Sequence, residues 1–236
     1  MTSFAEFRDT YEYRGDKIYE LIYERHKYSL RGKRPEVVVR NLKAIFEHAF
    51  EISQQRGFYA MSLRDLSRSS ELSIGALYGC IKSKNDIPNI VCDTINFVHT
   101  GFLQSYQNQP ASVDVLTALI RQSVYIAEIL DSWFRFLFRE KQHLDDESRR
   151  CILTLDESHL RLVAILISDQ LGKRVGQSVN EPVNRSDEFV DQAMIPRAVI
   201  SFVNEWSLKN SEYKSQGVTV DRYATALVEL TLRLLR

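Results

Sequence analysis

The sequence predicts an all-α fold, and three observations support this prediction. Apolar residues recur every three or four positions along most of the chain, which is the period of an amphipathic helix. Serines with an acid three positions later, an arrangement typical of helix starts, precede some of these stretches. No stretch combines strand-like alternation with a hairpin turn. A chain of 236 residues can bury one or two helical cores.

The first half of the chain contains four predicted helices after residue 34. The first begins at Pro35, which suits a first helical turn, and it ends before Gly57. Two short helices follow, one capped by Ser62 and the other capped by Ser73. The fourth starts near residues 83–86 and carries a long apolar stripe, which predicts that one of its faces is buried.

The second half is also predicted to be helical. Its expected helical segments are residues 113–127, 133–138, 153–167, 187–208 and 219–236. The polar residues 172–184 include two glycines and a proline, so we expect a loop there. Pro196 falls inside an expected helix and should kink it.

The net charge is zero, because 31 Lys and Arg residues balance 31 Asp and Glu residues. The charges are unevenly distributed: residues 1–24 carry a net −3, residues 25–92 a net +6 and residues 93–236 a net −3. A basic segment between acidic ones indicates one module with a specialised charge. A chance fluctuation can give the same excess, so a motif must decide between the two.

Residues 62–81 supply such a motif, since they read as helix, tight turn and helix. Helices of about two turns need support, and the stripe of residues 38–50 can provide it. A second helix held in this way can enter a DNA major groove while basic residues around it contact phosphates. Packing of a simple helical hairpin is the alternative. The candidate DNA-binding residues are Lys33, Arg34, Arg64, Ser73, Ile74, Gly75, Ala76, Tyr78, Lys82 and Lys84.

The segments SLRDLS from Ser62, LSIGALY from Leu72 and IKSKNDI from Ile81 resemble the DNA-binding region of the TetR family of bacterial transcriptional regulators. This resemblance implies that residues 73–79 form the recognition helix and that Tyr78 and Lys84 contact phosphates. It further implies a double-stranded DNA operator, a larger helical ligand-binding domain and a homodimer formed through the last two helices.

Two departures from the family pattern affect the motif. Glu71 stands where the family usually has glycine in the turn, which would cost about 1 kcal/mol if the residue must be left-handed. Cys80 and Ile81 replace a pair that usually resembles His-Phe in the family.

Residues 1–34 precede the usual family start and form an N-terminal extension. A helix is expected from about Asp16 to Leu30, and the basic residues Lys27, Arg31, Lys33 and Arg34, near and after its end, lead to the next helix. The extension either lies along the DNA backbone or minor groove as an arm, or packs back onto the protein.

Aromatic residues in the second half are sufficient for both a core and an apolar cavity. The candidate effector-binding residues are Phe102, Tyr106, Tyr125, Trp133, Phe134, Leu137, Phe138 and Trp206. The segments around Phe134–Glu140 and Asn204–Trp206 resemble TetR-type regulators of lipid, fatty acyl or sterol catabolism. That resemblance implies an apolar acid or acyl thioester as effector.

A rival interpretation is a di-metal carboxylate protein. Glu140 and His143, and likewise Asp156 and His159, are carboxylate–histidine pairs at a spacing of three, which helical bundles use to bind two metals. Surface polarity explains both pairs as well, so the favoured prediction has no metal, no cofactor and no catalysis.

The predicted organisation is therefore an extension (1–34), a helix-turn-helix DNA-binding domain (35–84) and an effector-binding and dimerisation domain (85–236). The longest apolar run has six residues, which is too short for a membrane span. The three scattered cysteines and the absence of a secretory leader favour the cytoplasm.

Overall fold

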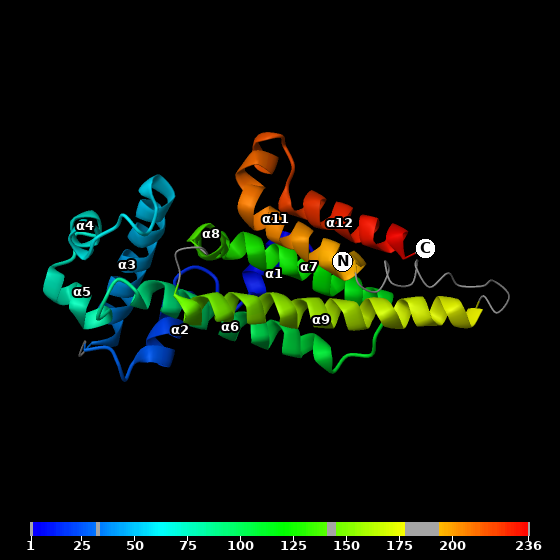
Figure 1. Cartoon of the computed structure of the whole chain (residues 1–236), viewed down its shortest axis with the longest axis horizontal. Coiled ribbons are helices and arrows are strands. Elements are labelled where there is room, and N and C mark those ends of the chain that lie inside the picture. Colours follow the sequence, from blue (N-terminus) through cyan, green and yellow to red (C-terminus); the bar gives the residue numbers. More distant parts are fainter. Residues whose placement is uncertain (1, 32–33, 141–144, 178–193, 236) are drawn as a thin grey trace. The chain divides into compact units, whose positions relative to one another are not determined.

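The computed structural model describes residues 2–31, 34–140, 145–177 and 194–235. Within these residues the regular secondary structure is entirely helical (Figure 1), so the all-α prediction is confirmed. Backbone contacts divide the chain into two compact units. The N-terminal unit consists of residues 11–98 and 132–152, and the C-terminal unit consists of residues 1–10, 99–131 and 153–236. These limits differ from the functional boundaries at 34/35 and 84/85, which stay a prediction.

The N-terminal unit is built around one long helix, α3, which contacts α2, α4 and α5. Its helices are α2 (Lys17–His26), α3 (Pro35–Arg56), α4 (Leu63–Ser69), α5 (Ile74–Cys80), the first part of α6 (Asp86–Gln107) and most of α8 (Asp131–Glu140). The predicted apolar stripe of α3 is buried; its members are Val38, Leu42, Ile45, Phe46, Ala49 and Phe50. The short helices α4 and α5 therefore have the support that their length requires.

An aromatic cluster completes the core of the N-terminal unit. The ring of Trp133 on α8 stacks on Phe46 at a centroid distance of 5.4 Å and meets Phe50 edge-on at 5.1 Å. Phe136, also on α8, lies 5.2 Å from Phe50 and 5.3 Å from Phe58. Such ring pairs bury large apolar areas and fix the geometry between helices, so α8 stabilises α3 through the side chains of Trp133 and Phe136.

The C-terminal unit is organised around α7, which contacts α1, α11 and α12. Its helices are α1 (Phe4–Thr10), the end of α6, α7 (Val113–Ile129), most of α9 (Asp146–Gln177), α11 (Ile195–Ser215) and α12 (Val220–Leu234). The last two lie side by side (Figure 1). Trp206 on α11 is fully buried, and its indole N–H donates to Glu128 on α7 at 3.0 Å.

Two expectations for the second half were wrong. Pro196 does not kink α11, because it occupies the first turn, where its missing N–H has no helical partner to lose. The irregular backbone in that helix is at Lys209, with φ −128° and ψ 16°. Residues 172–177 continue α9 instead of forming a loop; the remainder of the expected loop and the start expected at residue 187 lie outside the described residues.

Candidate nucleic-acid interface

The helix α5 presents one face to solvent and buries the other. Ser73 caps it, because its hydroxyl oxygen accepts a hydrogen bond from the backbone N–H of Ala76 at 3.1 Å. Ile74 and Tyr78 are 40% and 46% exposed, whereas Leu77 is fully buried. Ser73 and Gly75 are exposed and Ala76 is half-buried. The residues predicted at a DNA surface are thus accessible in the first turn of α5 and at Tyr78, and Leu77 holds the helix to its support.

The helix before it, α4, has a complete capping box. The Ser62 hydroxyl accepts from the Asp65 backbone N–H at 3.1 Å, and the Asp65 carboxylate accepts from the Ser62 backbone N–H at 3.0 Å. The Ser62 hydroxyl also donates to the Asp65 carboxylate at 2.6 Å, and this bond, then the bond from the Ser62 backbone N–H and then Arg56, lower the pKa of Asp65 to about 2. The acid of the predicted capping pattern therefore has a local structural role, and Arg64 and Arg68 stay accessible on this helix.

Glu71 adopts the left-handed conformation in the turn between α4 and α5, with φ 57°. Among the described residues other than glycine, it is the one with positive φ. A side chain in this region crowds the backbone, whereas glycine adopts the conformation without that cost. The condition under which the sequence makes Glu71 costly, a left-handed backbone, is therefore met.

Replacing Glu71 with glycine should therefore raise the unfolding free energy of the N-terminal unit by about 1 kcal/mol. Thermal or urea unfolding followed by circular dichroism measures the change. Glu71→Ala is the matched control, because it removes the carboxylate and keeps the backbone strain. Equal stabilisation by both variants would show that the carboxylate, and not the backbone, is responsible.

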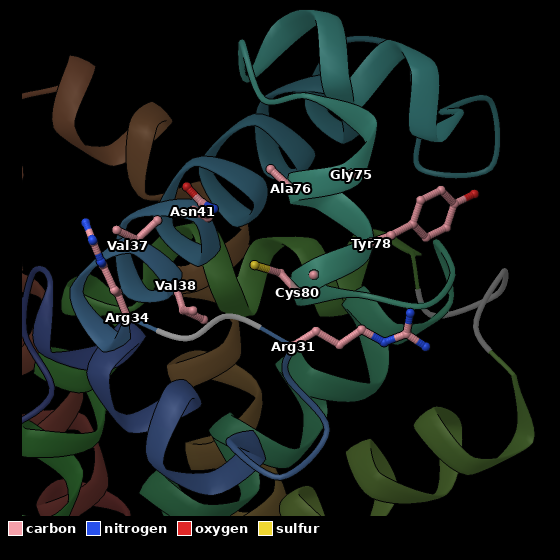
Figure 2. Close-up of a pocket in the computed structure, with 10 residues that line it drawn as sticks. Arg31, Arg34, Val37, Val38, Asn41, Gly75, Ala76, Tyr78 and Cys80 are labelled. Carbon is pink, nitrogen blue, oxygen red and sulfur yellow. The ribbon is translucent and has the colours of Figure 1, made fainter.

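An open groove of about 690 Å³ lies between the first turns of α3 and the helix α5 (Figure 2). Val37 and Asn41 line it from α3, and Ala76 and Tyr78 line it from α5. Arg31 and Arg34 also line it, and both are exposed. Arg34 directly precedes α3, so the positive end of the helix dipole lies close to the two guanidinium groups. This combination favours a polyanion.

The backbone of Arg31 is fixed to α5. Its N–H donates to the carbonyl of Gly79 at 2.9 Å. Sequence reasoning missed this bond, and it also missed Val37 and Asn41, which have no motif of their own. Each directly precedes a buried residue of α3, Val38 or Leu42, and this helical position is what could have indicated that Val37 and Asn41 lie on an accessible side. Lys33, another candidate, lies outside the described residues.

Lys84 has partners within the protein. Its ammonium group donates to the carbonyl oxygens of Tyr59 at 2.8 Å and Met61 at 3.0 Å, and it lies 5.4 Å from the ring centroid of Phe58. These contacts fasten the connection between α3 and α4. An ammonium has three N–H donors, so one remains for a phosphate. Lys82, two residues earlier, is exposed.

The extension packs onto the protein over much of its length. On α2, Ile18, Tyr19 and Ile22 are buried in the N-terminal unit. Arg25 donates two hydrogen bonds to Asp93, at 2.8 and 2.6 Å. These contacts agree with the alternative in which the extension packs onto the protein. Only the basic residues after α2 remain candidates for an arm that contacts DNA.

The Asp93 carboxylate anchors α2 to α6. The imidazole of His26 lies 3.1 Å from it, on the same carboxylate that binds Arg25. The adjacent His26 imidazole, and then the hydrogen bonds from Arg25, hold the pKa of Asp93 far below its usual range. The helix preceding the basic linker therefore has a fixed position in the N-terminal unit.

Solved structures similar to this one include those of two regulators. PfmR, a TetR family transcriptional regulator from Thermus thermophilus, is 20% identical with a TM-score of 0.56, and the match covers 81% of this chain and 97% of that one. FadR, a transcriptional regulator from Bacillus subtilis solved with stearoyl-CoA, is 12% identical with a TM-score of 0.53, covering 80% of this chain and 96% of that one. No protein-family model and no curated protein matches the sequence. This chain has the TetR regulator fold.

In this TetR fold, the candidate effector residues are divided between the two units. Four belong to the C-terminal unit: Phe102, Tyr106, Tyr125 and Trp206. Four belong to the N-terminal unit: Trp133, Phe134, Leu137 and Phe138. Trp133 and Leu137 are buried there, and the rings of Phe134 and Phe138 stack at 6.2 Å. The aromatic composition of the second half suggested these residues as one group, but composition does not indicate which unit each residue belongs to.

The di-metal alternative gains no support from this TetR fold. Glu140 is buried and accepts hydrogen bonds from the Ser53 hydroxyl at 2.6 Å and the Phe58 backbone N–H at 3.2 Å. His143 lies outside the described residues. Within the described part of the chain, no three His, Cys, Asp or Glu residues are grouped as metal ligands.

None of the described helices is long and apolar enough to cross a membrane.

Proposed function

We propose that this protein is a sequence-specific DNA-binding transcriptional regulator, a repressor that a small effector releases from its operator. The observation that carries the proposal is the exposed face of α5 beside the groove that Arg31 and Arg34 line. A capped helix with small N-terminal residues fits a major groove, and the arginines with the α3 N-terminus fit the flanking phosphates. In this proposal the protein catalyses no reaction. It acts in the cytoplasm, where it meets its DNA operator.

Each proposed DNA contact has a distinct task. Ser73, Ile74, Gly75 and Ala76 face base edges, whereas Tyr78 donates its hydroxyl to a phosphate. Arg34, Arg64, Lys82 and the remaining donor of Lys84 add phosphate contacts, as Lys33 does in the proposal. Phosphate contacts position the protein without reading sequence.

The proposed operator complex contains two chains. Exposed apolar side chains on the last two helices support pairing there: Phe202 and Leu208 on α11 are 41% and 47% exposed, and Leu230 and Leu234 on α12 are 41% and 47% exposed. A two-fold pair places two recognition helices in successive major grooves, about 34–36 Å apart. The effector is an apolar or acyl compound, a proposal supported by the stearoyl-CoA bound to FadR.

Selection from a random duplex DNA library tests the function. We expect a palindromic site bound by two chains, with its affinity reduced by stearoyl-CoA. Arg34→Ala should weaken binding to all duplexes and lower the slope of affinity against salt by about 1, because one phosphate contact is lost. Tyr78→Phe should likewise weaken binding without changing the preferred sequence, whereas Ala76 variants should change it.

Arg161→Ala is the matched control, because Arg161 is an exposed arginine of the C-terminal unit. It should leave both the affinity and the salt slope unchanged. The proposal fails if no duplex is enriched, or if Arg34→Ala and Arg161→Ala have equal effects.

A further inference from the structure

Three polar side chains from three helices meet inside the C-terminal unit. The Nε2 atom of His99 on α6 lies 3.3 Å from Nδ1 of His159 on α9. The Nε2 atom of His159 lies 3.0 Å from the hydroxyl of Ser123 on α7. Ser123 and His159 are 5% and 6% exposed, in a unit whose core is otherwise largely apolar. None of the candidate DNA-binding residues takes part in this cluster.

The hydrogen bonds of the cluster run in one direction. The Ser123 hydroxyl donates to the carbonyl of Leu119 at 2.7 Å, so its oxygen accepts from Nε2–H of His159. A neutral His159 protonated at Nε2 has a bare Nδ1, which accepts from Nε2–H of His99. The remaining nitrogen, Nδ1 of His99, is therefore an acceptor.

This last acceptor has no partner. Nδ1 of His99 is buried and makes no hydrogen bond in the described structure. An unsatisfied buried polar atom costs about 1–3 kcal/mol, and this cost disappears when a ligand supplies a donor. The neighbouring side chains are aromatic: the ring of Phe102 lies 6.4 Å from that of His99 and 5.3 Å from that of Tyr106.

Both imidazoles are neutral at pH 7. Burial lowers the pKa of His99 to about 4. Burial, followed by repulsion from His99, lowers the pKa of His159 well below its usual value. A neutral acceptor in apolar surroundings suits an uncharged donor better than an anion.

We propose that Nδ1 of His99 is the polar anchor of an effector site in the C-terminal unit, where it accepts a hydrogen bond from an uncharged hydroxyl or amide N–H on an otherwise apolar ligand. Phe102 and Tyr106, which follow His99 on α6, contact the apolar part. This inference rests on the proposed function only in treating the ligand as the effector.

Two matched pairs of probes test the anchor and distinguish its possible sources. 1-Dodecanol and dodecyl methyl ether differ in a hydroxyl donor, whereas N-methyldodecanamide and N,N-dimethyldodecanamide differ in an amide donor. Calorimetric titration without DNA should show that the donor member of one pair binds about five to ten times more tightly than its partner. The pair that discriminates identifies the donor. Equal affinity within both pairs, or no binding of any probe, overturns the proposal.

Three variants locate the discrimination at Nδ1. His99→Gln places an amide near the position of Nε2 and leaves nothing at Nδ1, so the difference within the pair should disappear. His99→Asn places a polar atom near Nδ1 and should retain part of it. Ser123→Ala changes the far end of the cluster and should retain the discrimination. The proposal is wrong if His99→Gln and Ser123→Ala behave alike, provided that their melting curves show both to be folded.

A spectroscopic measurement holds even if the glutamine variant does not fold. Two-bond proton–nitrogen correlation in the wild-type protein should show His99 protonated at Nε2 and bare at Nδ1, and the Nδ1 signal should shift when the preferred probe is added. A proton on Nδ1 in the free protein would contradict the direction of the network. Because DNA is absent from these experiments, their outcome is independent of the DNA-binding test.

Discussion

Replacing Trp133 with alanine is expected to lower the unfolding free energy of the N-terminal unit by about 3–5 kcal/mol, the usual cost of removing a buried tryptophan. Its side chain is 3% exposed, and its ring lies within 6 Å of three other aromatic rings, those of Phe46, Phe50 and Tyr19. Removing it leaves a cavity against α3, the helix that supports α4 and α5. We therefore expect weaker DNA binding as a consequence of lost stability.

Phe134→Ala is the matched control for this prediction. Phe134 is the next residue on α8, but it is half-buried and stacks on Phe138. Its removal should cost less than half as much, because the cost follows the apolar area lost. Circular dichroism measures both variants in urea, and in Trp133→Ala the remaining tryptophan, Trp206, reports the C-terminal unit by fluorescence. Comparable losses from the two variants would contradict the position of Trp133 in the core.

Acidification is expected to destabilise the C-terminal unit before any carboxylate is protonated to a large extent. In the unfolded chain histidine binds a proton below about pH 6.5, whereas folded His99 binds one only near pH 4. Between these values the unfolded state holds more protons, so stability falls as the pH falls. His99 alone should contribute a loss of about 2 kcal/mol between pH 7 and pH 5, and His159 adds to it in the same direction.

The variant His99→Gln separates this effect from other titrations. It removes one imidazole, so its urea midpoint should depend less on pH between 7 and 5 than that of the wild type. Trp206 fluorescence in a Trp133→Phe background follows the C-terminal unit specifically. Asp65, whose pKa is lowered to about 2, affects stability only at lower pH. An identical pH dependence with and without His99 would show that His99 does not cause the loss of stability on acidification.

Local patterns predicted the local structure well. Capping serines and a periodic stripe identified α3, α4 and α5, because these signals depend on residues within a few positions of one another. The strain at Glu71 was predictable for the same reason. Helix periodicity also predicted which residues of α5 are accessible and which are buried, since residues three or four positions apart lie on the same side of a helix.

Long-range contacts could not be predicted in this way. Nothing near Lys84 in the sequence indicates that its ammonium binds the carbonyls of Tyr59 and Met61, more than 20 residues earlier. The same holds for Trp133, which packs against residues more than 80 positions away. The His99–Ser123–His159 cluster was missed because its members have no common spacing, and the sequence offered His159 only as a surface polar residue or, in the rival interpretation, as a metal ligand.

The carboxylate of Asp221 joins the two ends of the chain. It accepts from the backbone N–H of Phe4 at 2.9 Å and from the hydroxyl of Tyr125 at 2.5 Å, and Phe4 is 217 positions away in the sequence. At about 5–20 residues per second, a ribosome needs roughly 10–40 s to make the chain between them. The helix α1 is thus made well before α12, and the bond between Phe4 and Asp221 can form only once α12 has been made.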